Sequence, residues 1–557
     1  MSDKLRFTLS PRFLFIYTIV VLLVPNVTLS ITEGMPLAAA IANVLLPGSL
    51  YILLMSLSGN TGRQVWILFP LVFFAAFQMV LIYLYGSGVI SVGMFLNVVT
   101  TNPDEAIELL DNLWPALVIV FVLYIPPLVV AAMQWAHHTR LDAAPRHRWR
   151  RAALYVLAAS AVFTATLYIA YPKGEEKQGR FEYRVEDDMY PINVFYNLGL
   201  AVHESYQSAH YRQRVAHFKF GAVATHPADS AEVYVLVVGE TARSRNFQLY
   251  GYDRPTNPLL SREKNLIVFT GVRSQSNTTH RSVPMLLTAA TADDHDRLYH
   301  EKGILAAFGE AGFHTAFFSN QLPNHSYIDF LGEEAHDVLF IKKGKKASAF
   351  YDVELLPYVK RELVQGHRKL FVVLHMYGSH FSYRDRYARA RAVFLPDGPA
   401  EAEANNRPRL INAYDNTIVE TDYILARLID MLRSEHCAAA LLYTSDHGEN
   451  IFDDKRELFL HAGPKPSEYD TDVPLLIWTS AAYDRQHPAI TGNLRRNRHK
   501  GVESNASVFP TMLSIAGIKA GARVDSLSLT NPAYHLGVRY YLNDHNHGVP
   551  LSAWGIK

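Results

Sequence analysis

The stretch that decides the fold is Val233-Tyr-Val-Leu-Val-Val-Gly-Glu-Thr-Ala-Arg243, an apolar run that stops at a glycine and an acid. A continuous run of apolar, β-branched residues is typical of a buried parallel strand. Because ligands of open α/β sheets bind outside the carboxyl ends of strands, Glu240 is a candidate metal ligand or base. The same residue could instead cap the next helix, and this stretch alone leaves both interpretations open.

Further apolar runs after Val233 alternate with helical patterns, which predicts a mainly parallel sheet. The expected strands are His314–Ser319, Leu370–Leu374, Ala439–Tyr443 and Leu475–Trp478. Polar residues follow most strands directly, as in Asn320, His375, Gly378-Ser-His380 and Ser445-Asp-His-Gly-Glu449. Since the carboxyl ends of parallel strands share one edge, we expect these residues to meet Glu240 there.

The residue types at this edge indicate a metal site. Asp446 and His447 carry the carboxylate and imidazole groups that bind zinc, and Glu240 would complete a mixed oxygen and nitrogen shell. The alternative for Asp446 and His447 is an ion pair within a loop.

A polar loop, 273–284, precedes an expected helix over Met285–Ala290 and supplies hydroxyl groups near a helix N-terminus. Thr278, Thr279 and Ser282 are each possible nucleophiles from chemistry alone, although Ser282 is better interpreted as a capping hydroxyl.

The N-terminal third contains five apolar runs, each close to the roughly 20 residues that cross a hydrocarbon core. They are Phe13–Ile31, Leu37–Leu57, Val65–Tyr85, Leu113–Met133 and Ala152–Tyr171. Basic residues precede the first run and lie between runs two and three and between runs four and five, whereas the loops after runs one and three lack Lys and Arg. The positive-inside rule therefore predicts a cytoplasmic N-terminus and places everything after Tyr171 outside the cytoplasm.

With 557 residues the chain is too long for one core. The expected domains are a five-helix transmembrane domain over 1–171, an interfacial bridging segment over 172–226 and a catalytic α/β/α domain over 227–557. The net charge of +1 indicates no class of partner, and the single Cys437 excludes any intrachain disulfide.

The loop after the third run contains Asn97-Val-Val-Thr-Thr101-Asn-Pro-Asp-Glu105. A helix start at Asn102 explains the proline and the acids that follow it. It does not explain Asn97 and Thr101, so a functional role for Asn97, Thr101 and Glu105 stays open.

The chain resembles the phosphoethanolamine transferases of Gram-negative inner membranes, which belong to the alkaline phosphatase and sulfatase superfamily. The resemblance lies in the five apolar runs, Val238-Gly-Glu-Thr-Ala-Arg243, Gly251-Tyr-Asp-Arg-Pro-Thr-Asn257, a threonine five residues before Pro284, His375-x-x-Gly-Ser-His380, Tyr414-Asp-Asn416 and Ser445-Asp-His-Gly-Glu449. It covers nearly the whole chain. It implies an N-terminal helical domain followed by an alkaline-phosphatase-like α/β/α domain in the periplasm.

The resemblance also implies site residues. A Zn²⁺ shell falls on Glu240, Thr279, Asp446 and His447, with Thr279 as the nucleophile that becomes phosphorylated. A second cluster, for substrate phosphate or another zinc, falls on His380 and His461, and the headgroup-binding pattern falls on Asn97, Thr101 and Glu105.

The implied reaction is a two-step transfer of phosphoethanolamine from phosphatidylethanolamine to an envelope glycolipid or glycan, with release of diacylglycerol. The protein is expected to be a monomeric, multi-pass inner-membrane enzyme without a nucleic-acid partner. Lipid A-modifying members have several disulfides and a lysine near the position of Asn320, and this chain has neither. These departures favour core sugars or other glycans as acceptors.

Three rival functions remain. A glycerol-phosphate transferase similar to lipoteichoic acid synthase shares the Glu, Thr, Asp and His set, and only the loop with Asn97 favours ethanolamine over it. A sulfatase fits less well, because Ser282-Val-Pro-Met-Leu286 lacks the arginine of the sulfatase motif. A non-catalytic membrane scaffold would not need to keep the ligand set.

Overall fold

The computed structural model describes residues 10–86, 88–100, 114–170, 183–344, 351–398, 402–463, 465–521 and 523–556, without the side chains of 97–100 and 114–116. These residues pack as two compact units. The helical unit contains the described residues up to Phe95 and from Trp114 to Val202. The α/β unit contains residues 96–100 and the described residues from His203 onward. The three domain boundaries expected from the sequence stay predictions.

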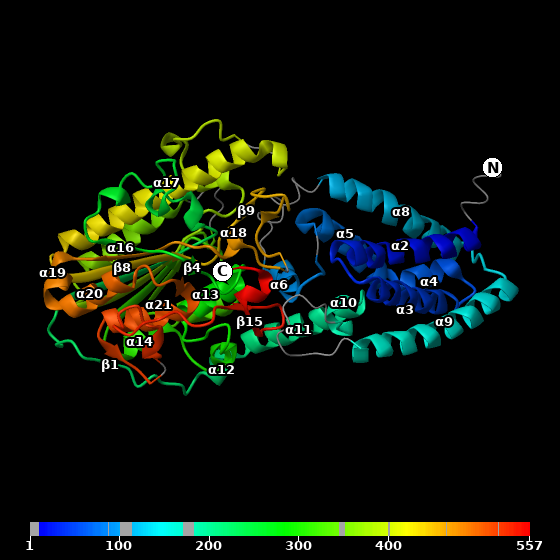
Figure 1. The fold of residues 1–557 in the computed structure, drawn as a ribbon, viewed down its shortest axis with the longest axis horizontal. Helices are drawn as coiled ribbons and strands as arrows, with labels where there is room; N and C mark the ends of the chain where they lie inside the picture. Colours follow the sequence, from blue (N-terminus) through cyan, green and yellow to red (C-terminus); the bar gives the residue numbers. More distant parts are fainter. Residues whose placement is uncertain are drawn as a thin grey trace. The chain divides into compact units, whose positions relative to one another are not determined.

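The helical unit contains the apolar helices that the sequence predicts (Figure 1). Four helices of the described residues are long and apolar enough to cross a membrane, and a bent pair adds a fifth span when it is counted as one. The prediction of five spans is therefore confirmed, with the third span broken. The helices are α2 (Pro11–Thr32), α3 (Leu37–Met55), the bent pair α4 (Thr61–Ile67) and α5 (Phe69–Tyr85), α8 (Trp114–Ala136) and α9 (Ala143–Ala170), with α6 (Val92–Thr100) after α5.

The third span is bent where a continuous helix was expected. α4 and α5 are bent by 63° at the break between them, where Leu68 is the only residue in neither helix. Pro70 lies in the first turn of α5, and a residue without an N–H cannot continue the hydrogen bonds of α4. Pro25 and Pro47, in contrast, lie inside unbroken helices.

Two asparagines interrupt the first two apolar runs, and they hydrogen-bond to each other. Asn26 Nδ2 donates to the main-chain oxygens of Asn43 and Tyr190, each at 2.7 Å. Asn43 Nδ2 donates to the Asn26 carbonyl at 3.2 Å and to the Ser30 hydroxyl at 3.0 Å. Buried amides are costly unless they are hydrogen-bonded, so this pairing explains why α2 and α3 tolerate them.

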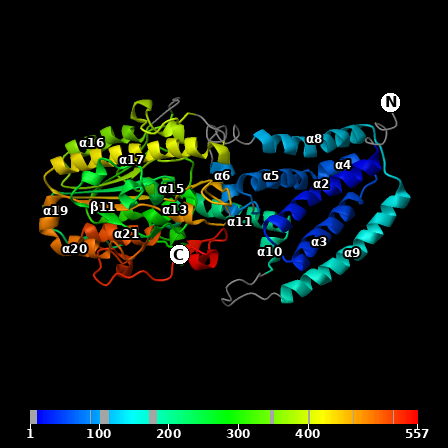
Figure 2. The ribbon, with the colours of Figure 1, turned by 45° about the horizontal axis from the view of Figure 1, so that its top comes forward.

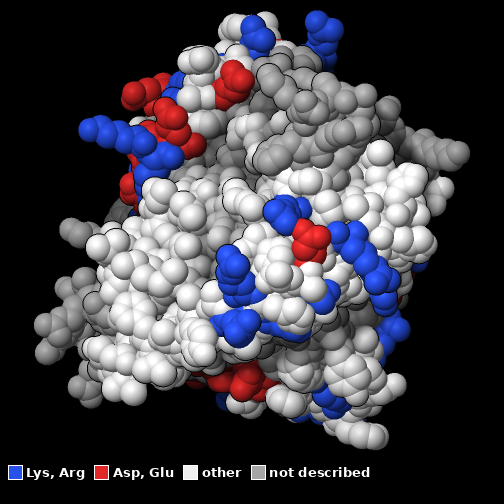
Figure 3. Space-filling view, turned by 90° about the vertical axis from the view of Figure 1, so that its right-hand side faces the viewer, with Lys and Arg blue, Asp and Glu red and all other residues white. Residues whose placement is uncertain are grey.

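Basic side chains gather at one end of the helical unit (Figure 3). Arg12 and Arg63 are exposed near the starts of α2 and α4, Arg140 lies between α8 and α9, and Arg148 and Arg151 lie near the start of α9. The described residues at the opposite helix ends, 30–37, 83–86 and 88–96, contain neither Lys nor Arg. The helical unit therefore concentrates its basic residues at one end, and Arg184, which pairs with Asp187, is a basic residue of the other end.

The segment 172–226 was expected to bridge the domains at the membrane interface. Residues 172–182 lie outside the described part of the chain, and the rest contains α10 (Val185–Asp188), α11 (Ile192–Ala209) and α12 (Tyr211–Arg214). Large apolar side chains of α11 are exposed, among them Phe195, Tyr196 and Tyr206. Exposed aromatic residues suit a membrane interface, which stays a prediction for this segment.

The α/β unit is built on a seven-stranded sheet in the order β3-β11-β8-β2-β7-β5-β6. The strands from β8 to β6 are parallel, whereas β11 is antiparallel to both of its neighbours. Every predicted strand is confirmed, as is the mainly parallel sheet, while β3 and β6 were not predicted. The bounds are β2 (Glu232–Gly239), β3 (Leu266–Phe269), β5 (His314–Ser319), β6 (Asp337–Phe340), β7 (Lys369–His375), β8 (Ala438–Ser445) and β11 (Leu475–Thr479).

Helices cover both faces of this sheet. α16 (Leu356–Val364) and α17 (Arg407–Ser434) lie on one face, and α14 (Ile304–Glu310) and α21 (Ser504–Ile515) lie on the other, as Figures 1 and 2 show. The central strand β2 is buried along its whole length, so its ends are fixed by packing on both sides.

The remaining helices are α13 (Thr279–Leu287), α15 (Tyr327–Gly332), α18 (Glu468–Thr471), α19 (Ala481–Gln486) and α20 (Pro488–Asn497). Short strands pair as β1 (Val223–Ala224) with β13 (Ile518–Lys519), β4 (Val272–Arg273) with β12 (Val502–Glu503), β9 (Asn450–Ile451) with β10 (Phe459–Leu460) and β14 (Tyr540–Leu542) with β15 (Gly548–Pro550).

Candidate active site

The register of the parallel strands brings Glu240 and Asp446 to the same edge of the sheet. β2 pairs with β8 so that Gly239 stands beside Ser445, and the next residue of each strand leaves the sheet there. The main-chain N–H of Asp446 also donates to the Gly239 carbonyl at 3.1 Å. Two carboxylates that are far apart in the sequence are thus held side by side.

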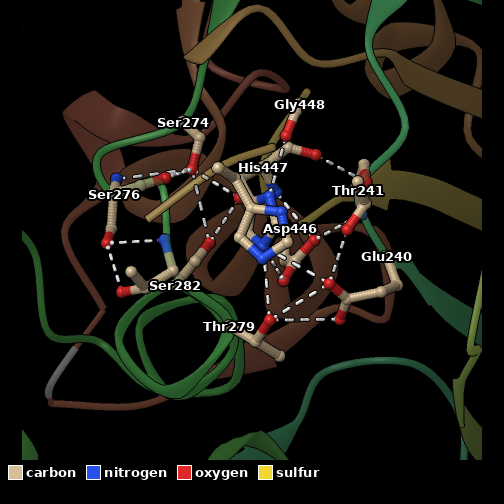
Figure 4. Close-up of polar contacts among 12 residues, drawn as sticks. Glu240, Thr241, Ser274, Ser276, Thr279, Ser282, Asp446, His447 and Gly448 are labelled. Carbon is tan, nitrogen blue, oxygen red and sulfur yellow. Dashed lines mark hydrogen bonds and ion pairs between the residues drawn. The ribbon is translucent and has the colours of Figure 1, made fainter. Parts of the chain in front are cut away.

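Glu240, Thr279, Asp446 and His447 come together at this edge (Figure 4). The Thr279 hydroxyl oxygen lies 3.1 and 3.3 Å from the two carboxylate oxygens of Glu240 and 3.2 Å from His447 Nε2. His447 Nε2 lies 3.3 Å from Glu240 Oε1 and 3.3 Å from Asp446 Oδ2. The two carboxylates and the imidazole are fully buried, whereas the threonine is only partly buried.

The three candidate hydroxyls, of Thr278, Thr279 and Ser282, make different contacts in the structure. Thr278 Oγ1 lies 3.2 Å from Ser276 Oγ. Ser282 Oγ donates to the Asp446 carbonyl at 2.6 Å, which is a supporting contact. Among the described residues, Thr279 is the member of the three whose hydroxyl contacts the carboxylate and imidazole groups of the site.

The helix that carries this hydroxyl begins earlier than predicted. The expected bounds, Met285–Ala290, are wrong, because α13 starts at Thr279 and ends at Leu287. The polar residues 279–282 form its first turn, which has no apolar periodicity to reveal it in the sequence. The Arg281 N–H already donates to the Thr278 carbonyl at 3.2 Å, so it is the N–H groups before it, at the very start of α13, that can favour an anion such as phosphate next to Thr279.

The buried charges of the site shift one another's pKa values. Burial raises the pKa of Glu240, but the hydrogen bond and charge of His447, with the charges of His380 and His461, hold it well below its usual range. Burial and the Glu240 charge raise the pKa of Asp446 to about 7. Burial alone would lower the pKa of His447, but the nearby Asp446 and Glu240 outweigh this effect and raise the pKa to about 10. A proton on His447 therefore offsets the carboxylate charge until a metal cation replaces it.

Four of the distances among the donor atoms suit a tetrahedral zinc ion. Ligands bound at the usual zinc distances are about 3.3 Å apart, and the contacts of the Thr279 oxygen and His447 Nε2 are 3.1 to 3.3 Å long. His447 Nδ1 contacts the Gly448 carbonyl at 2.9 Å, which keeps the proton on Nδ1 and leaves Nε2 free as a ligand. Asp446 Oδ2 is buried and has no hydrogen-bond partner among the described residues, as expected of an atom reserved for a cation.

His461 and His380 flank this centre. The His461 ring centroid lies 4.1 Å from that of His447 and 5.9 Å from that of His380. One ligand atom each of Glu240, His447 and His461 lies within 4.8 Å of the other two. His461 Nδ1 also contacts Glu449 Oε1 at 3.2 Å, so its ring is held in place. The two histidines predicted as a second cluster thus lie at the rim of the same site.

Two contacts to Glu240 were not predicted. Gln321 Nε2 donates to Glu240 Oε2 and to the Met376 carbonyl, each at 3.0 Å. Gly378 has a φ of +50°, and a Cβ at this position would lie 2.5 Å from the Glu240 carbonyl oxygen. Sequence reasoning selected Asn320 at the end of β5, whereas the next residue makes the contact. Gln321 belongs to the same polar stretch as Asn320, but the sequence does not show in which direction its side chain points.

The motifs at 251–257 and 414–416 support the site rather than line it. The Asp415 carboxylate accepts hydrogen bonds from the Tyr252 hydroxyl at 2.9 Å and from Arg254 at 2.5 Å. The Tyr414 hydroxyl donates to the carbonyl of Thr241 at 2.8 Å. Helix α17 therefore anchors the loop that follows Glu240.

The membrane-loop residues cannot be placed. Asn97 lies in α6, but its side chain is outside the described part of the chain, as are Thr101 and Glu105 altogether. Their role as headgroup ligands stays a prediction.

A cavity of about 290 Å³ lies beside α13 within the α/β unit. His295 Nδ1, Arg281 Nε and Asn546 Oδ1 are buried around it without hydrogen-bond partners in the described part of the chain. Glu204 and Tyr299 also line it. Unpartnered buried donors and acceptors indicate that the cavity takes a polar group.

Comparisons with known proteins identify relatives of this chain. The model of the sulfatase family matches residues 232–518, more than half of the chain, and the model described as phosphoethanolamine transferase EptA/EptB matches residues 49–206. The Kdo(2)-lipid A phosphoethanolamine 7''-transferase of Salmonella typhimurium is 29% identical over 497 residues, which cover 82% of this chain and 83% of the relative.

Solved structures share the fold. The integral membrane lipooligosaccharide phosphoethanolamine transferase A (EptA) of Neisseria meningitidis superposes with a TM-score of 0.68 at 21% identity, over 93% of this chain and 97% of that one. The periplasmic domain of Escherichia coli EptC, solved as a complex with Zn, has a TM-score of 0.54 at 23% identity, over 59% of this chain and 95% of that one. Together with the apolar helices, this likeness makes the chain a multi-pass membrane protein with a soluble C-terminal part. The two family matches show that the chain belongs to the sulfatase family and, within it, to the phosphoethanolamine transferases.

Proposed function

We propose that the protein transfers phosphoethanolamine from phosphatidylethanolamine to a hydroxyl or phosphate of an envelope glycolipid or glycan, through a phosphorylated Thr279. The observation that carries the proposal is the Thr279 hydroxyl at a helix N-terminus, 3.1 Å from Glu240 and 3.2 Å from His447. The names of its relatives, among them a transferase that acts on Kdo(2)-lipid A, support the transferred group and the class of acceptor.

Glu240, Thr279, Asp446 and His447 would hold a zinc ion, and their spacing supports this assignment, as does Asp446 Oδ2, which accepts no hydrogen bond in the described part of the chain. When bound, zinc lowers the pKa of the threonine hydroxyl and offsets the negative charge of the transferring phosphoryl group. The E. coli neighbour solved with Zn supports zinc over other divalent ions.

The first step forms a bond between the Thr279 oxygen and the phosphorus of the donor, and it breaks the bond from phosphorus to the glycerol oxygen. Diacylglycerol leaves after it takes up a proton, and phosphoethanolamine remains as an ester on Thr279. In the second step the acceptor oxygen forms a bond to the same phosphorus, the bond from phosphorus to the Thr279 oxygen breaks, and the threonine oxygen takes up a proton from the acceptor hydroxyl or from water. His380 and His461 lie at the rim, where they can bind phosphate oxygens or move these protons.

The acceptor is a sugar hydroxyl or a phosphate, and the chain's departures from lipid A-modifying relatives favour core sugars or other glycans. The cavity beside α13 supports binding of a polar acceptor group, since it presents unpartnered donors and acceptors, and its Arg281 already pairs with Asp544 at 2.9 Å. An arginine that is already neutralised is a weaker site for an acceptor phosphate than for a sugar hydroxyl.

The decisive experiment follows the transferred group. The purified protein is incubated with phosphatidylethanolamine labelled in its headgroup, and Thr279→Ala is compared with the matched variant Thr278→Ala. We expect phosphoethanolamine on Thr279 of the wild type and of Thr278→Ala, and none on Thr279→Ala. Normal transfer by Thr279→Ala would refute the assignment. Labelling from phosphatidylglycerol instead of phosphatidylethanolamine would make the protein a glycerol-phosphate transferase.

The acceptor and the location need separate tests. Mass spectrometry of envelope glycolipids and glycans with and without the protein should reveal one molecule that gains phosphoethanolamine.

We further propose an inner-membrane protein with a cytoplasmic N-terminus and a periplasmic α/β unit, which the single basic end of the helical unit supports. Because Cys437 is the only cysteine, its labelling by a membrane-impermeant maleimide in cells with a permeabilised outer membrane tests this orientation. Labelling only after the inner membrane is opened would contradict it.

A further inference from the structure

A second group of metal-binding side chains lies at the opposite ends of the strands that carry the active site. His314 and Asp337 are the first residues of β5 and β6, and His367 lies just before β7. Glu362 comes from α16, on one face of the sheet. The active-site residues follow the carboxyl ends of β2, β7 and β8, so this group is at the amino-terminal edge and is separate from them.

The side chains are close enough to share one ion. His314 Nε2 lies 2.6 Å from Asp337 Oδ2 and 3.8 Å from Glu362 Oε2. The rings of His314 and His367 stack with centroids 3.7 Å apart and planes 4° apart. One ligand atom from each of His314, Glu362 and His367 lies within 4.8 Å of the other two. Because ring nitrogens bind a metal in the plane of the ring, at least one of the two parallel rings would have to rotate, and His367 Nε2 to leave its 3.0 Å contact with Gln365 Oε1, to reach the roughly 3.3 Å ligand spacing of a tetrahedral zinc shell.

The buried carboxylate of Glu362 gives independent support. Its side chain is completely buried, and Oε1 accepts a hydrogen bond from Arg361 at 2.9 Å. Oε2 has no hydrogen-bond partner in the described part of the chain, and its 3.8 Å separation from His314 is too long for one. A buried carboxylate oxygen without a partner is costly, and a cation at this position would remove the cost.

A neighbouring histidine belongs to the surroundings of this group. The His336 ring stacks on His314 with centroids 5.0 Å apart, but its Nδ1 contacts the Thr315 hydroxyl at 2.8 Å. Glu362 and Asp337 supply two negative charges toward a divalent cation, and Arg361, the basic group that faces Glu362, already pairs with its Oε1 at 2.9 Å. Two imidazoles with two carboxylates form a ligand set typical of zinc.

We propose that His314, Glu362 and His367, with Asp337 as the fourth ligand, form a structural zinc site that ties α16 to the strand ends of β5, β6 and β7. The chain has one cysteine, so no disulfide can stabilise this domain. A zinc ion that joins one helix to three strand ends binds the folded chain and not the unfolded one, so it stabilises the folded state by a free energy that grows with the logarithm of the zinc concentration divided by its Kd.

The test uses full-length protein without an affinity tag, purified in detergent and passed through gel filtration after zinc loading. The double variant His314→Ala/His367→Ala is compared with His217→Ala/His300→Ala, a matched control that removes two exposed histidines elsewhere. Elemental analysis should show about one zinc per chain less in the first variant than in the wild type and the control. Glu362→Gln preserves the shape of the side chain and should lose the same zinc, which guards against a variant that fails to fold.

A second arm separates this site from the proposed active site. In the background Asp446→Asn/His447→Ala, the zinc at the amino-terminal edge should remain, and EDTA should lower the unfolding temperature by about 2 °C or more. Removing His314 and His367 in this background should abolish both the bound zinc and the effect of EDTA. Equal zinc content in all variants, or zinc that is lost from every protein on gel filtration, would overturn the proposal. These outcomes do not depend on whether Thr279 transfers phosphoethanolamine.

Discussion

Replacing Gly378 by alanine should displace the carboxylate that holds the centre of the site. Gly378 has a φ of +50°, and an added Cβ would lie 2.5 Å from the main-chain oxygen of Glu240 and 2.8 Å from its nitrogen. Both are backbone atoms, so no flexible side chain can move away. The left-handed conformation costs about 1–2 kcal/mol for a non-glycine residue. The clash adds about 1–3 kcal/mol, as in other overpacked sites, and moves Glu240.

Gly366→Ala is the matched control. Gly366 has a φ of +73° and nothing within 4 Å of an added Cβ, so it carries the conformational cost without the clash. Chemical unfolding in EDTA should show that Gly378→Ala loses about 1–3 kcal/mol more than Gly366→Ala. Competition with a zinc-binding dye should show a loss of about 10–100-fold in zinc affinity for Gly378→Ala alone, because it shifts a ligand. Equal stability and equal zinc affinity of the two variants would refute the reasoning about Glu240.

The remaining predictions concern the same centre. Gln321→Met removes the amide that donates to Glu240 at 3.0 Å, so zinc affinity and the rate of transfer should each fall about 10–100-fold. An unchanged rate of transfer would show that this contact does not orient the Glu240 carboxylate. Zinc uptake by Thr279→Ala should release about one proton at pH 8 and about two at pH 6, because the metal-free pKa values of His447 and Asp446 are about 10 and about 7. Zinc affinity should therefore fall as the pH falls, and more steeply below pH 7. Calorimetry in buffers of different ionisation enthalpy measures the number of released protons. The same number of released protons at pH 6 and pH 8 would contradict the assignment. Prolonged dialysis against EDTA should abolish transfer and added zinc should restore it, whereas full activity of metal-depleted protein would exclude a zinc-dependent reaction.

The sequence predicted five of the seven strands of the sheet. An apolar run such as 233–238 is unambiguous when both faces of the strand are buried, and the next polar residue then marks the edge of the sheet. That logic selected Glu240 and Asp446. It missed β6 (Asp337–Phe340), whose residues are mostly half-exposed and show no continuous apolar run.

Other features depend on side-chain direction, which periodicity does not report. Chemistry alone did not separate Thr278 from Thr279, with Ser282 already preferred as a capping hydroxyl, and only the resemblance selected Thr279 before the start of α13 showed the direction of its side chain. Gln321 was passed over for Asn320 for the same reason, since neighbouring residues at a strand end point to different sides. Such choices were accessible only through the resemblance to a family or through the structure.

The burial of the site explains why its parts cannot be exchanged one at a time. Three of the four candidate ligands are fully buried, and their charges balance only when His447 carries a proton or a cation is bound. Removing Glu240 or Asp446 leaves the opposite charge buried, so such variants should lose stability as well as zinc. Thr279 is different, because it is only partly buried and is uncharged, and its loss should spare the fold. The nucleophile is therefore the residue at which chemistry and stability separate, which makes Thr279→Ala the most informative single substitution in the chain.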